Sequence, residues 1–332
     1  MAQFADLPWT TTAEGAPRRV GVELEMAGLD AERIAEAVIE ELGGEFQADS
    51  AFSGHVRGTT LGDFRVELDA RVLTDRGYLD SLRRLGIDIE PGQTRDNLES
   101  LLSTVAGWVV PHELVCPPTP VDALPRIDAV RRRLHLAGAK GTQSSALYAF
   151  GLQFNIEVPG FEVDPLLAVL RAFFVEYDHI LERESIDLAR KLTPFVQPFP
   201  RDYVEYVLRP DYEPDLDTLI DDYLRFTPTR NRPLDALPLF AHIAPERVDA
   251  APVEHELVKA RPAWHYRLPN CRIDDPDWNL SEPWAEWVRV ERLAASPERL
   301  SRRARRRLEE PGAVARWLGR VRDWLTGGGE PS

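Results

Sequence analysis

Acidic side chains recur at every second position in two segments of this 332-residue chain. In residues 20–26 and in residues 64–72, apolar side chains alternate with pairs of carboxylates. This alternation predicts half-buried β-strands, in which the two acids of a pair share a face with Cα atoms about 6.5–7 Å apart. A further Glu comes just before a strand that Pro117 and Pro118 end. The acids in question are Glu23, Glu25, Glu67, Asp69 and Glu113.

Carboxylates that crowd one sheet face raise one another's pKa, and burying them without partners is costly. Bound cations or arginines are the usual remedies, and hard ions such as Mg²⁺ prefer oxygen ligands and leave positions for phosphate. The pattern therefore indicates a face that holds Mg²⁺ and a nucleotide phosphate. The alternative is an ordinary sheet whose polar side chains simply face water.

Two later segments carry side chains suited to the same chemistry. The strand predicted over residues 148–158 directs Gln153, Asn155 and Glu157 to its polar side. The basic segment 264–273 carries the candidate catalytic residues, which are Arg267, Asn270 and Arg272. Guanidinium groups bind phosphate or carboxylate, and Asn270 would orient one of them. An ordinary solvated basic strand is the alternative.

Helical periods separate these strands. Residues 31–42 follow Asp30, a predicted N-cap, and end at Gly43. Further helices are predicted over residues 96–108, over 122–134 and from Asp164 to about Leu192. We therefore expect an α+β fold built around an antiparallel sheet.

The composition excludes several classes of protein. The net charge of −15 disfavours a general nucleic-acid or anionic-membrane binder. No apolar stretch is long enough to span a bilayer, and the first residues do not resemble a signal peptide. The only cysteines, Cys116 and Cys271, are far apart, which argues against a disulfide framework and for a reducing compartment such as the cytoplasm.

Composition also divides the chain. Residues 1–17 are polar and rich in Pro, Gly and Thr, and we expect them to be disordered. Residues 18–295 form the predicted catalytic domain, with a helical or irregular insertion over 161–262. Residues 296–332 contain nine arginines and read as a basic helical tail. The Arg run 302–307 is either a solvated face or a surface that docks on the acidic body or on an acidic partner.

Five segments occur in an order typical of one family. They read RRVGVELEM, FRVELDARVL, HELVCPPTP, GLQFNIEVPG and YRLPNCR. Together they resemble the amidoligase family, whose members share the fold of glutamine synthetase and glutamate–cysteine ligase. The resemblance covers about residues 18–293.

This resemblance implies a glutamine-synthetase-like antiparallel sheet with helices packed on one face. It implies an ATP- and Mg²⁺-dependent ligase that joins a small-molecule or peptide carboxylate to an amine through an acyl phosphate. The family's metal ligands come from the acidic sheet face described above, and the resemblance implies that Gln153, Asn155 and Glu157 line a nucleotide site. Related ring-shaped enzymes build their sites between subunits, so an oligomer is also an expectation.

The chain departs from the family pattern at two places. A His-x-His strand is replaced by Gln153-Phe154-Asn155, which offers weaker, uncharged ligands. A late Glu-x-Arg strand has only Val290-Glu291-Arg292 as its counterpart, and residues 281–295 fit a core helix better. Two alternatives therefore stay open: a binding or scaffold protein that has lost catalysis, and a metal-dependent phosphohydrolase.

Overall fold

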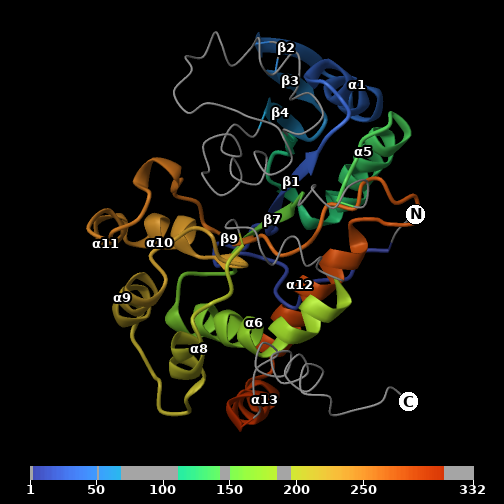
Figure 1. Cartoon of the computed structure of the whole chain (residues 1–332). Coiled ribbons are helices and arrows are strands. Elements are labelled where there is room, and N and C mark those ends of the chain that lie inside the picture. The colour runs from blue at the N-terminus through green and yellow to red at the C-terminus, as the bar shows by residue number, and fades with distance from the viewer. Residues whose placement is uncertain (1–2, 51, 69–110, 143–149, 185–195, 310–332) are drawn as a thin grey trace, which may run out of the picture.

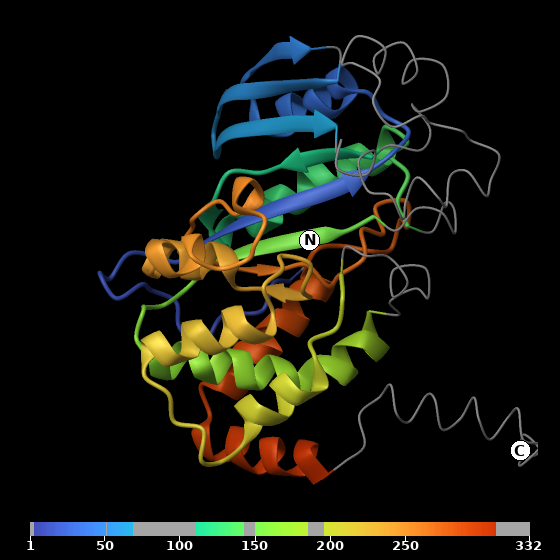
Figure 2. The same ribbon diagram turned by 60° about the vertical axis from the view of Figure 1, so that its left-hand side comes forward.

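A nine-stranded antiparallel sheet runs through the molecule (Figures 1 and 2). The computed structural model describes residues 3–50, 52–68, 111–142, 150–184 and 196–309. The strands of the sheet follow in the order β2 (Glu45–Ser50), β3 (Ser53–Thr59), β4 (Gly62–Leu68), β5 (His112–Val115), β1 (Arg19–Met26), β7 (Leu152–Glu157), β9 (Ala263–Tyr266) and β8 (Leu234–Asp235), and the short β6 (Thr119–Pro120) also pairs with β1.

Nine α-helices accompany the sheet in the described part of the chain, which confirms the predicted α+β class. They are α1 (Ala31–Leu42), α5 (Leu124–Leu136), α6 (Val163–Arg183), α8 (Arg201–Leu208), α9 (Leu216–Phe226), α10 (Leu237–Ile243), α11 (Pro245–Asp249), α12 (Ser281–Ala294) and α13 (Pro297–Glu309). Figure 1 shows α1 and α5 beside β1 to β4, and α6, α12 and α13 at the opposite end.

The apolar face of the sheet builds the core. In β1 the side chains of Val20, Val22, Leu24 and Met26 are fully buried, as their alternation predicts. At the other end of the sheet, aromatic rings of α12 and α6 close the same face. The ring pairs that join sheet to helices are Phe154–Trp284, Tyr266–Trp287 and Tyr266–Phe173. The acidic side chains of β1, β4 and β5 lie on the opposite face of the sheet.

Local signals set the first helix as predicted. The Asp30 side chain accepts a hydrogen bond from the Arg33 amide at 2.8 Å, which caps α1. Gly43 follows the helix with a φ of 75°, a conformation that favours glycine. The prediction for α6 is wrong at both ends, because the helix begins at Val163, one residue before the expected cap Asp164, and ends at Arg183 and not near Leu192.

The N-terminal segment was expected to be disordered, and this expectation is wrong for the residues from 3 onward. Leu7 is buried, and the carbonyl oxygen of Ala5 accepts a hydrogen bond from Trp284 Nε1 at 2.8 Å. The carbonyl oxygen of Asp6 accepts another from Arg292 Nη2 at 3.2 Å. Backbone hydrogen bonds to side chains of α12 hold a segment whose own composition predicts no structure.

Residues 281–294 are helical, as the core-helix reading of them predicts, so the Glu-x-Arg strand is wrong. Glu291 lies in the core and forms a two-pronged ion pair with Arg18, at 2.7 and 2.8 Å. Both side chains are almost completely excluded from solvent, at 0% exposure for Arg18 and 1% for Glu291. Trp287 Nε1 donates to the same carboxylate at 2.9 Å. This pair ties the start of β1 to α12.

Two arginines of the basic helix α13 contact the body, as one alternative for the Arg run predicts, whereas Arg302, Arg305 and Arg306 are exposed, as a solvated face predicts. Arg303 contacts Glu176 of α6, and Arg307 Nη2 lies 3.2 Å from Asp178 Oδ2. Glu176 is buried, so a cation beside it offsets the cost of burying its charge.

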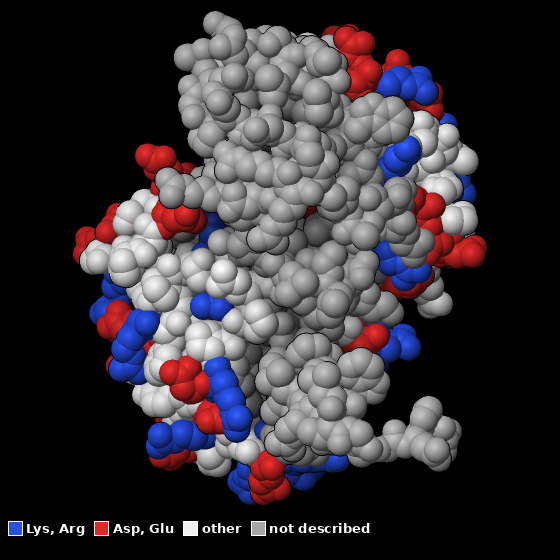
Figure 3. Space-filling model, in the orientation of Figure 1, with Lys and Arg blue, Asp and Glu red and all other residues white. Residues whose placement is uncertain are grey.

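Acidic and basic side chains are interspersed on the molecular face shown in Figure 3, where they border a large area of residues outside the description. No helix among the described residues is long and apolar enough to span a membrane.

Candidate active site

Three glutamates stand side by side across three adjacent strands on the polar face of the sheet. Glu113 of β5 pairs directly with Glu25 of β1 on one side and with Glu67 of β4 on the other. Directly opposed residues of antiparallel strands have Cβ atoms about 4.5–5.5 Å apart, and like charges there destabilise the sheet. Such a row persists only where protons, cations or arginines balance it.

The outer two members of this row have partners within the chain. Glu25 Oε2 accepts a hydrogen bond from the Gly151 amide at 2.6 Å, which draws the carboxylate toward the β7 side of β1. Glu67 Oε1 accepts one from Arg65 Nη2 at 3.1 Å. Glu113, the central member, is only 4% exposed, so an ionised Glu113 without a proton, cation or arginine beside it would be costly.

Glu113 shares a hydrogen bond with Glu23, the other acid on the polar face of β1. Burial is the largest influence on the pKa of Glu23 and raises it, but the hydrogen bond from Glu113 and the effects of His265, Asn155 and Arg267 together outweigh burial and lower this pKa. A hydrogen bond between two carboxyl groups requires that the pair Glu23–Glu113 share one proton. A carboxyl–carboxylate pair of this kind is a place where a cation can replace a proton.

A chain of amides continues from this pair along the polar face. Asn155 Nδ2 donates to Glu23 Oε1 at 2.7 Å, and Gln153 Nε2 donates to Asn155 Oδ1 at 2.6 Å. Gln153 Nε2 also lies 3.2 Å from His265 Nδ1. The two residues that replace the family's His-x-His pattern thus connect the acids to a histidine on β9.

His265 and Asp235 belong to this site, although the sequence interpretation did not select them. In the register of the sheet, Asn155 pairs with His265 and His265 pairs with Asp235. The alternation of buried Trp264 and Tyr266 with His265 was a signal for its place on the polar face. Asp235 lies on a two-residue strand in a Pro-rich region, and no comparable signal marks it.

Arginines border the site at its β9 end. Arg261 Nη1 lies 3.7 Å from Glu23 Oε1, and Arg267 Nη1 donates to the carbonyl oxygen of Arg230 at 2.9 Å. Of the basic residues chosen from the sequence, Arg267 is close enough to Glu23 to lower its pKa. The polar face as a whole carries carboxylates on β4, β5 and β1 and guanidinium groups beside β9.

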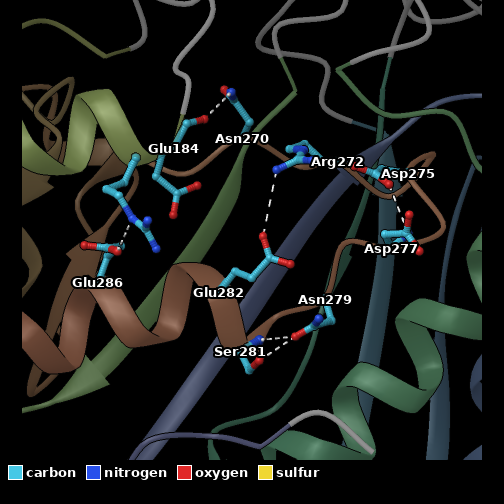
Figure 4. A network of polar contacts seen from close by, with 10 residues as sticks. Glu184, Asn270, Arg272, Asp275, Asp277, Asn279, Ser281, Glu282 and Glu286 are labelled. Atoms are coloured by element: carbon cyan, nitrogen blue, oxygen red, sulfur yellow. Dashed lines mark hydrogen bonds and ion pairs between the residues drawn. The ribbon is translucent and has the colours of Figure 1, made fainter.

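The other candidate catalytic residues lie in the loop after β9 (Figure 4), where Asn270 is opposite Gly151, the residue whose amide donates to Glu25. Asn270 forms an isolated bridge with Gly151 and donates to the Glu184 carbonyl oxygen at 3.5 Å. Arg272 forms an ion pair with Asp275, and its Nη1 lies 3.9 Å from Glu282 Oε2. Arg272 is thus already paired with two acids.

The remaining predicted site residues are Glu157 and Asp69. Glu157 Oε2 accepts a hydrogen bond from the Arg19 amide at 2.8 Å, at the edge of the acid-bearing face. This contact gives Glu157 a structural role at the start of β1. Asp69 lies outside the described residues.

The sequence matches a family model described as "putative amidoligase enzyme" over residues 16–289, which is most of the chain. The chain belongs to this family. The searches of curated proteins and of solved structures found no match. Membership agrees with the resemblance drawn from the five sequence segments, and the family's description names no substrate.

The acid row of this amidoligase supplies donors that suit a hard divalent cation. Glu23, Glu113, Glu25 and Glu67 provide carboxylate oxygens, which Mg²⁺ prefers. In the described ranges, no three or more His, Cys, Asp or Glu side chains come together closely enough to hold an ion. The reason is visible in the contacts, because Glu25 turns to Gly151 and Glu67 turns to Arg65. The acids thus have suitable ligand atoms for Mg²⁺ and lie on one face of the sheet. Glu25 and Glu67 would have to reorient before they could coordinate an ion together with Glu23 and Glu113.

Asp235 makes a pH-dependent contribution to the stability of this amidoligase. Complete burial raises its pKa to about 6, although Arg267, the Leu237 amide and Arg230 oppose the shift. Because the folded-state pKa exceeds the unfolded value near 3.9, its contribution is favourable at low pH and is lost as pH rises through about 6. We expect Asp235→Asn to increase the free energy of unfolding by about 3 kcal/mol at pH 8 and by about half of that at pH 5.

Urea denaturation at the two pH values measures this difference. Asp217→Asn is the control, because the Asp217 side chain is 65% exposed and should show little effect at either pH. An equal gain from Asp235→Asn at pH 5 and pH 8 would contradict the assignment.

Proposed function

We propose that this chain is a carboxylate–amine ligase. In the proposed reaction, ATP phosphorylates a carboxylate, and an amine displaces the phosphate to give an amide, ADP and inorganic phosphate. The observation that carries the proposal is the row Glu25–Glu113–Glu67, joined to Glu23 and bordered by arginines. A polar face that merely met water would have no reason to bury its central carboxyl group.

Within this proposal, Mg²⁺ would be held by Glu23 and Glu113 together with Glu25 or Glu67, and Asp69 is a further candidate from the sequence. When bound, the ion neutralises the phosphates and polarises the bond that breaks. Arg267 and Arg261 lie near Glu23, where their positive charges would balance the oxygens of a phosphate or of the substrate carboxylate. Transfer of a phosphoryl group depends mainly on such positioning and charge balance, and this site offers both.

Gln153 and Asn155 have a positioning role in the proposal. Their amide groups hold the Glu23 carboxylate through two hydrogen bonds in series. They add no charge, so the acid row has to supply the charge that a cation needs. We also propose that the sheet is glutamine-synthetase-like and that the protein acts in the cytoplasm, where ATP is available.

Nucleotide binding provides the first test. We expect ATP to raise the melting temperature only when Mg²⁺ is present, by roughly 4 °C at a hundredfold excess over Kd, which corresponds to about 2.7 kcal/mol. Glu23→Gln should abolish this shift, and Glu298→Gln, at a side chain that is 95% exposed, should leave it unchanged.

The same experiment addresses the scaffold alternative. An equal melting temperature with and without MgATP, in the wild type and in Glu23→Gln, would contradict nucleotide binding and favour a non-catalytic protein.

A further inference from the structure

The environment of His265 is unusual for a buried histidine. It lies at the centre of a cross-strand row between Asn155 and Asp235, and it is only 7% exposed. Neither neighbour forms a hydrogen bond with its ring. Its Nδ1 atom lies 3.2 Å from Gln153 Nε2, whereas Nε2 is buried and has no hydrogen-bond partner among the described residues.

The hydrogen-bond chain fixes which ring nitrogen carries the proton. The Asn155 amide nitrogen donates to Glu23, so the Asn155 oxygen is free to accept from Gln153. The Gln153 amide nitrogen is then the donor toward His265 as well, and Nδ1 must be the acceptor. A neutral His265 therefore carries its hydrogen on Nε2, the atom without a partner.

Burial is the main reason why the ring is neutral. Burial, with smaller contributions from Arg267, Arg261 and Arg230, lowers the pKa of His265 to about 3 against the opposing effect of Glu23. A buried N–H donor without an acceptor costs about 1–3 kcal/mol. A negatively charged oxygen would accept this hydrogen bond, at a place where Arg267, Arg261 and Arg230 are near enough to influence the charge of the ring.

We propose that His265 Nε2–H donates a hydrogen bond to an oxyanion that binds beside Arg267 and Arg261. The inference rests on the proposed function for the identity of this anion, which is either the carboxylate to be activated or a phosphate group of the nucleotide. His265 contacts this group directly, and Gln153 acts as a positioning residue that holds the required tautomer. The chain from His265 through Gln153 and Asn155 to Glu23 thus links anion binding to the acid row.

Calorimetric titration of the full chain with two probes tests the proposal. The probes are ADP with Mg²⁺ as a source of phosphate and succinate as a source of carboxylate. We expect at least one to bind the wild type and to bind His265→Phe about 10- to 100-fold more weakly, because a hydrogen bond to a charged group is lost. The probe whose affinity falls in His265→Phe identifies the anion.

Two variants separate this role from simple packing. His265→Gln keeps a donor close to the position of Nε2 and should restore affinity to within about threefold of the wild type. His255→Phe, at an exposed histidine, should bind both probes normally.

A measurement on the wild type keeps the proposal testable if His265→Phe does not fold. The ¹⁵N chemical shifts of His265 should show the Nε2–H form and should move when the bound probe is added. Three results would overturn the proposal: neither probe binds the wild type, His265→Phe binds both probes as tightly as the wild type does, or the ring hydrogen of His265 resides on Nδ1. If the wild type forms no amide but His265→Phe still binds a probe more weakly than the wild type, the proposed ligase function is wrong and the proposed oxyanion site is supported.

Discussion

Replacing Glu291 with Gln should lower the free energy of unfolding by about 3–5 kcal/mol, the largest effect on stability that we expect of any substitution proposed here. Glu291 and Arg18 form a fully buried, two-pronged ion pair, and Trp287 donates to the same carboxylate. The Gln side chain would leave the Arg18 guanidinium as an uncompensated charge in the core. Arg18 would keep its hydrogen bonds to the carbonyl oxygens of Trp9 and Glu157 and only one acceptor oxygen at position 291.

Urea denaturation at pH 7 measures this loss. Glu36→Gln is a suitable control, because Glu36 forms an exposed ion pair with Arg33 and should change stability by less than about 1 kcal/mol. Replacing both members of the buried pair, as Arg18→Met with Glu291→Leu, should cost less than Glu291→Gln alone, because no unpaired charge remains. A loss for Glu291→Gln no larger than that of the control would show that the pair does not hold β1 to α12.

Replacing Glu23 with Gln should lower kcat/KM by about 10²- to 10³-fold, because a metal-linked carboxylate supplies several kcal/mol of charge stabilisation. Folding should be nearly unchanged, since a Gln oxygen can still accept the hydrogen bond from Asn155 Nδ2. Glu113→Gln should have a similar effect, and the double variant should be little worse than either single one, because the two acids act as a unit.

Steady-state kinetics with melting curves for each variant would separate catalysis from folding. If Glu23→Gln loses activity only in proportion to a lowered melting temperature, the acid has a structural role. If the two single losses multiply in the double variant, Glu23 and Glu113 do not share one task.

The sequence predicts the faces of strands far better than it predicts their neighbours. Alternation correctly assigns the buried and polar sides of β1 and β7. The row Glu25–Glu113–Glu67 depends on the register of three strands separated by long segments, and no local pattern encodes that register. The sequence therefore identifies the acids, and only the structure shows that Glu113 is the central one.

Elements without a hydrophobic pattern were missed for a physical reason. The hairpin of β2 and β3 has mostly exposed or half-exposed side chains, so it lacks the alternation that marks a strand. Asp235 lies on a strand of two residues, which is too short for any periodic signal. In both cases the pairing partners decide the structure, and they are distant in the sequence.

Basic residues show the same limit. Arg267 and Arg272 are five positions apart and look equivalent in the sequence. The chain leaves the sheet after Tyr266, and the loop that follows brings Asp275 and Glu282 to Arg272. Arg267 instead remains close enough to Glu23 and His265 to influence their pKa values.

Product analysis after incubation with ATP tests the central claim most directly. The wild type is incubated with pooled carboxylic acids in the presence and absence of amines and of Mg²⁺, and ADP, phosphate and amide are quantified together. The account predicts equal amounts of amide and ADP that require both amine and Mg²⁺, with less than about 1% of this yield from Glu23→Gln. Release of phosphate without any amine and without amide, as a phosphohydrolase would give, would contradict it.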